Sequence, residues 1–179
     1  MGPRTVYSGR KIRLDLRPSV DTDGRTREYE VIVHPGAAVI LPLLDDGRVV
    51  MIRNQRIAVG RALLELPAGT IDPPEAPASC AARELTEETG YRAASMEPLV
   101  SFFSSPGISD ELMHVFVAQG LEPDATRLEP GEKIETVPME YVDVLDAVRD
   151  GRIQDAKTIV AVLFYDRFRR ADRGDAGAV

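Results

Sequence analysis

The chain has 179 residues, of which 44% are hydrophobic and 28% are charged, and its formal net charge is −7. This charge excludes capture of nucleic acid by a broadly basic surface, and no apolar run approaches the roughly 20 residues that span a membrane. The first residues lack the apolar stretch of a secretory signal, and the lone Cys80 cannot form an intramolecular disulfide. We therefore expect one cytoplasmic domain without a membrane or nucleic-acid partner.

Residues 1–36 are expected to form an antiparallel β-meander. Short β-like stretches at 6–8, 11–16 and 27–33 are separated by turn residues, most clearly at 21–24. Both faces of these strands carry polar residues, so the meander cannot bury a core of its own. It must pack on the main domain or on another chain.

The main domain is expected over residues 37–170. Residues 37–44 are nearly all apolar, 45–47 read as a turn, and 48–53 continue the pattern, which together predict a buried hairpin. The remaining elements are predicted as strands at 97–104, 112–120 and 134–138, helices at 73–90, 141–149 and 155–169, and a frayed tail at 171–179. This order predicts a mixed α/β fold.

The predicted helix within 73–90 carries an unusual set of carboxylates. Glu84, Glu87 and Glu88 lie within about 100° of one another around a helix, beside the apolar seam formed by Ala78, Ala81, Ala82 and Leu85. Like charges this close repel and raise one another's pKa unless a cation neutralises them. Mg²⁺ is a hard ion that takes oxygen ligands, so the cluster suits it, and Arg83 is placed to form an i,i+4 ion pair with Glu87.

The stretch that contains this helix resembles the Nudix box, G-x5-E-x7-R-E-U-x-E-E-x-G-U, where U is apolar or aromatic. The matching residues are Gly69, Glu75, Arg83, Glu84, Leu85, Glu87, Glu88, Gly90 and Tyr91. The resemblance implies an α/β/α sandwich that hydrolyses nucleoside diphosphates linked to another group. It also implies that Glu84, Glu87 and Glu88 bind Mg²⁺, with Mn²⁺ as a substitute. By the same resemblance Gly69 shapes the loop, Glu75 and Arg83 orient the helix, and Gly90 ends it.

Outside the box, the chain resembles the ADP-ribose pyrophosphatase branch of that family. The supporting stretches are HisProGly at 34–36, GluLeuProAlaGly at 65–69, SerProGly at 105–107 with Glu111 after it, and AspAlaLysThr at 155–158. The resemblance implies hydrolysis of ADP-ribose to AMP and ribose 5-phosphate, a metal contact from the Ala68 carbonyl, and Glu65 and Glu111 as substrate-site residues. It further implies a catalytic loop glutamate acting with Glu84 and Glu87: Glu132 is preferred, with Glu129 and Glu135 as alternatives.

Two departures from the branch concern substrate binding. Its usual Arg-Gln-Tyr-Arg run appears here as Arg53-Asn54-Gln55-Arg56, and Arg56 is expected to contact phosphate. The chain has no tryptophan, so adenine stacking falls to Tyr29, Arg27 or an aliphatic residue, and the base specificity stays open.

The quaternary structure and the substrate follow from the same resemblance. N-terminal strands are commonly exchanged between subunits in this branch, which predicts a homodimer. The alternatives to ADP-ribose hydrolysis are action on other nucleotide sugars such as GDP-mannose, action on dinucleotides, or a catalytically silent domain that senses ADP-ribose.

Overall fold

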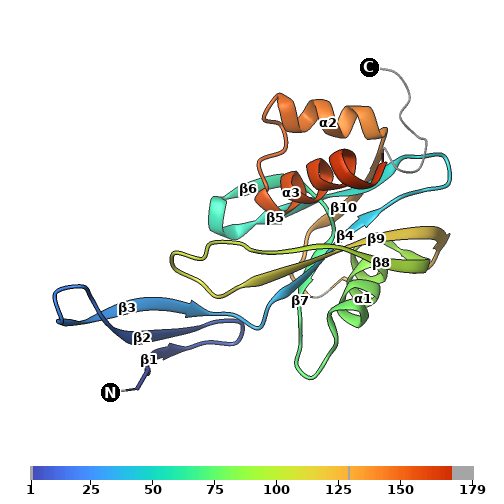
Figure 1. The fold of residues 1–179 in the computed structure, drawn as a ribbon. Helices are drawn as coiled ribbons and strands as arrows, with labels where there is room; N and C mark the ends of the chain where they lie inside the picture. The colour runs from blue at the N-terminus through green and yellow to red at the C-terminus, as the bar shows by residue number, and fades with distance from the viewer. Residues whose placement is uncertain (1, 129, 171–179) are drawn as a thin grey trace.

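The structure, a computed structural model, describes residues 2–128 and 130–170, so the predicted tail at 171–179 lies outside the described residues. A small N-terminal sheet projects from a larger body that contains the helices (Figure 1). Within the described residues, no helix is both long enough and apolar enough to cross a membrane.

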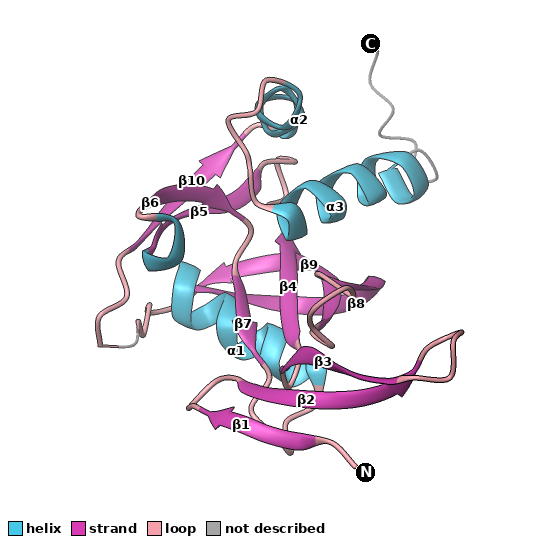
Figure 2. Cartoon of the chain, turned by 90° about the vertical axis from the view of Figure 1, so that its left-hand side faces the viewer, coloured by secondary structure: helices cyan, strands magenta, loops and turns pink. Residues whose placement is uncertain are grey.

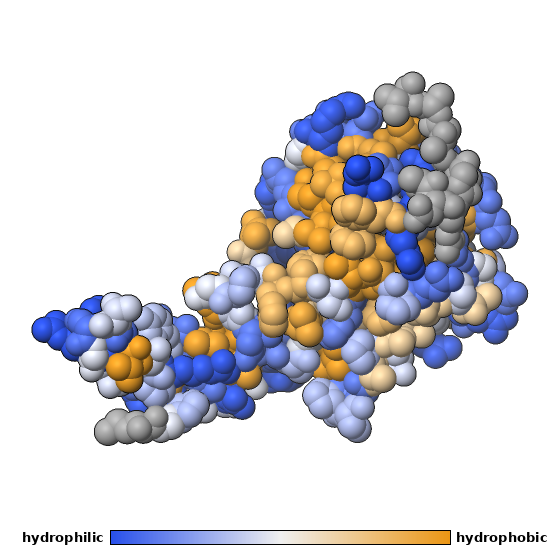
Figure 3. All heavy atoms as spheres, in the orientation of Figure 1, coloured by the Kyte–Doolittle hydropathy of each residue, from blue (hydrophilic) through white to orange (hydrophobic). Residues whose placement is uncertain are grey.

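The N-terminal sheet is the expected meander. Its strands are β1 (Arg4–Ser8), β2 (Arg13–Val20) and β3 (Thr26–Val33), paired antiparallel in the order β1-β2-β3. Among the described residues of these strands only Asp15 is buried, where Thr5 and Arg13 donate hydrogen bonds to it. Figure 3 shows this projection as mostly hydrophilic, with isolated hydrophobic residues. The sheet therefore has no core of its own, as the polar alternation predicts.

The larger body contains two sheets. The four-stranded sheet has the order β7-β4-β9-β8 and comprises β7 (Ala68–Thr70), β4 (Ala37–Pro42), β9 (Leu112–Pro123) and β8 (Tyr91–Phe103). The three-stranded sheet has the order β10-β5-β6 and comprises β10 (Ile134–Met139), β5 (Val49–Arg56) and β6 (Arg61–Glu65). A short 3-10 turn, η1 (Ile57–Val59), joins β5 to β6.

Helices cover both faces of the four-stranded sheet. Helix α1 (Pro77–Thr89) lies on one face and α3 (Ala156–Tyr165) lies on the other (Figure 2), with α2 (Tyr141–Arg149) packed against α3 and the turn η2 (Asp166–Arg170) continuing α3. Strand β4 supplies alternate residues to the two layers: Ala38 and Ile40 pack with α1, while Val39 and Leu41 pack with α2 and α3. This is the period-two alternation of a strand buried on both sides. The expected α/β/α sandwich is confirmed.

The predicted hairpin over residues 37–53 is wrong. Its two halves, β4 and β5, enter different sheets and share only an isolated bridge between Leu43 and Val49. Strand β4 instead pairs parallel with β9 and antiparallel with β7. A continuous apolar run shows that a strand is buried, but it carries no information about which strand lies beside it.

Candidate active site

A cavity of about 640 Å³ lies where α1, the strands β5 to β7, the start of α3 and the β1–β2 turn meet. The charged residues that line it include Glu84, Glu87, Glu88, Glu111, Glu132, Arg10, Lys11, Arg56, Arg83 and Lys157. A concave site with several convergent charged groups is the expected location of binding and catalysis.

Arg83 neutralises part of the carboxylate face of α1. Its Nη1 donates to Glu84 at 2.6 Å and to Glu87 at 3.0 Å, which includes the predicted i,i+4 pair. Its Nε and Nη2 both donate to Glu75 at 3.0 Å. These bonds raise the pKa of Arg83 and lower the pKa of Glu75. One guanidinium thus contacts three carboxylates, and the predicted role of Arg83 and Glu75 in orienting the helix stays a prediction.

Glu88 occupies a different environment from the other two box glutamates. It is only 5% exposed, and its carboxylate accepts a hydrogen bond of 2.9 Å from the backbone N–H of Ala68. Burial raises the pKa of Glu88 to about 8, and the nearby charge of Glu84 adds to the rise, although the Ala68 N–H opposes it. Burial also raises the pKa of Glu84. Burial therefore disfavours the charged form of both carboxyls, most strongly that of Glu88.

The carboxylate oxygens of Glu84, Glu87 and Glu88 suit a hard divalent cation, but their present positions do not form a coordination site. Among the described residues, no three Asp, Glu, His or Cys side chains converge as metal ligands. Glu84 and Glu87 face Arg83, and Glu88 faces the Ala68 amide. Metal binding at these oxygens would require the carboxylates to change partners, which fits ligands on flexible side chains and the oxygen preference of Mg²⁺.

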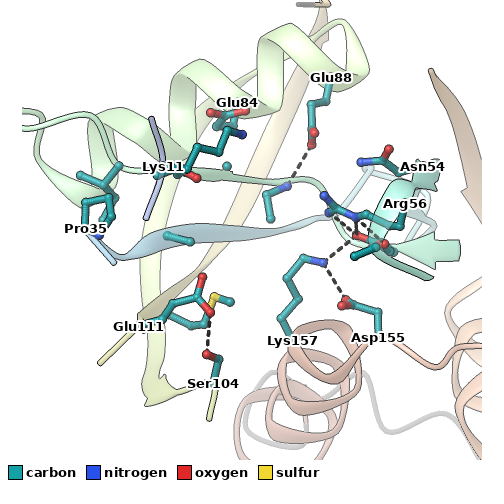
Figure 4. Close-up of a pocket in the computed structure, with 18 of the residues that line it drawn as sticks. Lys11, Pro35, Asn54, Arg56, Glu84, Glu88, Ser104, Glu111, Asp155 and Lys157 are labelled. Atoms are coloured by element: carbon teal, nitrogen blue, oxygen red, sulfur yellow. Dashed lines mark hydrogen bonds and ion pairs between the residues drawn. The ribbon is translucent and has the colours of Figure 1, made fainter. Parts of the chain in front are cut away.

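Arg56 lies beside Lys157 and Asp155 on the cavity wall (Figure 4), and Glu65 also lines the cavity. Glu65 is fully buried, and its two oxygens accept hydrogen bonds from Arg56 and Lys157. Its carboxylate is therefore engaged by protein cations instead of being presented to a ligand. Arg56 is the exposed member of the pair and remains the predicted phosphate contact.

Four further glutamates were predicted around the site. Glu111 lines the cavity and accepts a hydrogen bond of 2.5 Å from the Ser104 hydroxyl. Glu132 also lines the cavity, close enough to Glu84 and Glu88 for its charge to act on both. Glu135 instead pairs with Arg53 outside the cavity lining, and Glu129 lies outside the described residues.

The stretch that carries Glu132 is anchored near both ends. At its start, the N–H of Asp124 donates to the Gly90 carbonyl at 2.7 Å and that of Arg127 to the Glu87 carbonyl at 3.0 Å. At its end, the Gln55 N–H donates to the Lys133 carbonyl at 3.2 Å. The stretch therefore begins at the end of α1 and returns to the edge of β5.

Two predicted adenine contacts lie away from this cavity. Arg27 pairs with Asp21 near the distal turn of the N-terminal sheet, and Tyr29 is exposed on β3. Arg10 and Lys11, which the sequence reading missed, line the cavity from the β1–β2 turn, and neither makes an ion pair with a described residue. A basic pair in a turn is visible in the sequence, but nothing local shows that this turn reaches the cavity.

A protein-family comparison decides the identity of this scaffold. The model described as the NUDIX domain matches residues 33–163. The chain belongs to the Nudix family. The match contains β4 to β10, helices α1 and α2 and most of α3, and therefore the acidic face of α1.

Several Nudix relatives match most of the chain. The ADP-ribose pyrophosphatase of Bacillus subtilis is 34% identical over 161 residues, which are 89% of this chain and 87% of the relative. The methanol dehydrogenase activator of Bacillus methanolicus is also 34% identical, with the same coverage. The GDP-mannose pyrophosphatase of Cronobacter sakazakii is 38% identical over 136 residues, 70% of each chain. A solved structure titled ADP compounds hydrolase has a TM-score of 0.80 at 24% identity, covering 98% of this chain and 97% of that one, and shows the fold.

The two glycines of the Nudix box are required by the structure for different reasons. A Cβ at Gly69 would lie 1.9 Å from the carboxyl of Glu84, so any larger residue would displace that carboxyl from its present position. Gly90 adopts φ 72° at the end of α1, the left-handed conformation that favours glycine, and its N–H donates to the Thr86 carbonyl. The helix starts with Pro77 at its first turn, as predicted.

Proposed function

We propose that this Nudix protein hydrolyses the pyrophosphate bond of ADP-ribose and releases AMP and ribose 5-phosphate. The observation that carries the proposal is the convergence of the three box glutamates, Arg56 and Glu132 on one cavity. The ADP-ribose pyrophosphatase relative, similar over 89% of this chain, supports the choice of substrate.

We propose Mg²⁺ as the metal, held by Glu84, Glu87, Glu88 and the carbonyl of Ala68, with Mn²⁺ as a substitute. Mg²⁺ would neutralise phosphate charge and lower the pKa of a bound water. Arg83 keeps Glu84 and Glu87 oriented, and the Ala68 N–H holds Glu88 at the cavity wall. These contacts hold the three carboxylates at the cavity wall, where they would exchange their protein partners for the metal.

The other lining residues divide the remaining tasks. Arg56 can donate to phosphate oxygens, which neutralises the diphosphate as charge moves onto it. Glu132 accepts the proton of the attacking water, since it lies close to Glu84 and Glu88. Glu111, whose carboxylate accepts a hydrogen bond from Ser104, lines the same cavity and would contact the substrate there.

A panel of substrates tests the proposal. The protein is incubated with ADP-ribose, GDP-mannose and a dinucleoside polyphosphate, with and without Mg²⁺, and a phosphatase converts phosphomonoester products to phosphate. The proposal expects metal-dependent phosphate release that is fastest from ADP-ribose. Release that is fastest from GDP-mannose would favour the second candidate function, nucleotide-sugar hydrolysis, which the Cronobacter relative supports. Binding of ADP-ribose without release would favour a silent sensor.

We further propose that the protein is a homodimer in which the N-terminal sheet packs on a second copy. The sheet exposes Val6, Tyr7, Val20 and Tyr29 although it lacks a core. Burial of these side chains against another subunit would stabilise the sheet and bring Arg27 and Tyr29 toward a nucleotide base. Light scattering that finds only monomers in an active preparation would contradict this. The cytoplasmic location and the domain boundary at residue 36 stay predictions.

A further inference from the structure

Four charged side chains form a linked group on the cavity wall (Figure 4). Arg56 ends β5, Glu65 ends β6, and Asp155 and Lys157 lie at the start of α3. Arg56 donates from Nε to Glu65 Oε1 at 2.9 Å and from Nη2 to Oε2 at 2.6 Å. Lys157 Nζ lies 2.6 Å from Glu65 Oε2 and 2.9 Å from Asp155 Oδ2. Three separate elements thus meet through Glu65.

Glu65 is the centre of this group. It is 0% exposed, so water cannot solvate its charge. Burial alone would raise the pKa of Glu65, but the hydrogen bonds of Arg56 and the charge of Lys157 lower it overall. A buried carboxylate of this kind is kept in its charged form by the two cations beside it.

The bidentate pair with Glu65 fixes the plane of the Arg56 guanidinium. Two of its three nitrogens are occupied by the carboxylate, and no bond to a described residue is recorded for Nη1. The Arg56 side chain remains 39% exposed, and it lines the cavity that holds the box glutamates. Since the guanidinium is a rigid fork, the direction of its remaining donors depends on where Glu65 lies.

The start of α3 is itself fixed against the same strand end. Asp155 caps the helix by accepting from the Thr158 N–H at 3.0 Å and from its hydroxyl at 2.5 Å. The Leu66 N–H donates to the Thr158 hydroxyl oxygen at 2.8 Å. This cap holds Lys157 beside Glu65 although the two residues are 92 positions apart in the sequence.

We propose that Lys157 and Asp155 are positioning residues of the substrate site: acting through Glu65, they set the direction in which Arg56 offers its free donors to the diphosphate. The proposal rests on the proposed function in one respect, namely that Arg56 contacts the substrate's phosphates. It adds that the docking of the C-terminal helix determines the affinity for the diphosphate.

A double-mutant cycle between Lys157 and Arg56 tests the inference. The variants Lys157→Met, Arg56→Gln and the double variant are titrated with the α,β-methylene analogue of ADP-ribose and Mg²⁺ in a calorimeter. Each single substitution should weaken binding about ten- to hundred-fold, the range of one charge-assisted hydrogen bond. The double variant should bind no more weakly than Arg56→Gln alone, because Lys157 has no effect once Arg56 is absent. Effects that multiply in the double variant would overturn the proposal.

Val162→Ala provides the matched control. Val162 is fully buried on the same helix and packs in the hydrophobic core with Val39 and Leu41. It should lower the melting temperature and leave the affinity for the analogue unchanged. An equal loss of affinity in Val162→Ala and Lys157→Met would show that only general stability matters, and would overturn the positioning role. If Lys157→Met does not fold, Lys157→Gln enters the same cycle, since its amide can still donate to Glu65.

The same measurements separate this inference from the proposed function. If the wild-type protein binds the analogue but does not hydrolyse ADP-ribose, the proposed function is wrong, and the double-mutant cycle can still be measured by binding. Wild-type protein that hydrolyses ADP-ribose while Lys157→Met binds the analogue normally overturns the inference alone.

Discussion

Metal-free protein should lose stability as the pH rises, because the folded state holds a proton on Glu88 that the unfolded chain releases. Folding raises the pKa of this carboxyl from 4.5 to about 8. Between these two values the folded state binds more protons than the unfolded state, so stability falls with increasing pH. A pKa difference of this size changes the free energy of unfolding by at most roughly 5 kcal/mol between low and high pH. For a chain of this length, that corresponds to about 10 to 20 °C in melting temperature. Glu88→Gln should make the slope clearly smaller while keeping an acceptor for the Ala68 N–H.

Mg²⁺ should reverse this dependence, since it binds the charged form of the carboxylate. Melting curves of the wild type and Glu88→Gln in chelator, at several pH values from 5 to 9, give the metal-free slope. Calorimetry with Mg²⁺ in buffers of different ionisation enthalpy counts released protons, and a group with a pKa near 8 should release about 0.9 proton at pH 7. Equal pH slopes for the two proteins, or metal binding without proton release at pH 7, would refute this account of Glu88.

Three further predictions follow from the cavity. Gly69→Ala should fold, because its Cβ meets only the far end of a flexible glutamate, yet displacement of that carboxyl should lower Mg²⁺ affinity at least about tenfold in a metal titration. Glu132→Gln should reduce kcat by roughly 10²–10⁴ with little change in Mg²⁺ affinity, and an unchanged kcat would remove it as the base. The variant that carries both Arg10→Gln and Lys11→Gln should have a higher KM at low salt with kcat unchanged. Arg4→Gln, in the same sheet, should leave KM unchanged. If the two variants have equal KM values, the β1–β2 turn has no role in substrate binding.

What could be predicted from the sequence was mainly local. The carboxylate face of α1 follows from helical spacing, and so does the contact between Arg83 and Glu87, because residues four apart on a helix must be neighbours. The termini of α1 at Pro77 and Gly90 follow from their backbone preferences. These features depend on few residues and on no distant part of the chain.

The features that could not be predicted depend on distant contacts. The apolar pattern of β4 suits a hairpin as well as the observed pairing with β9, since both bury the strand. The bond between Lys157 and Glu65 joins residues 92 positions apart and has no local signature. Arg27 and Tyr29 were chosen for their chemistry, but the position of the N-terminal sheet brings Arg10 and Lys11 to the cavity of this chain instead.

The anchored ends of the stretch before β10 limit how far Glu132 can travel. Its neighbour Lys133 is tied to β5 through its carbonyl, and adjacent Cα atoms are separated by only about 3.8 Å. A large swing of the backbone at Glu132 would therefore require the strand edge to open. The position of the Glu132 carboxylate can therefore change mainly by rotation of its side chain. A longer chain between the anchors at Arg127 and Lys133, as evolution could supply, would allow the backbone to move further.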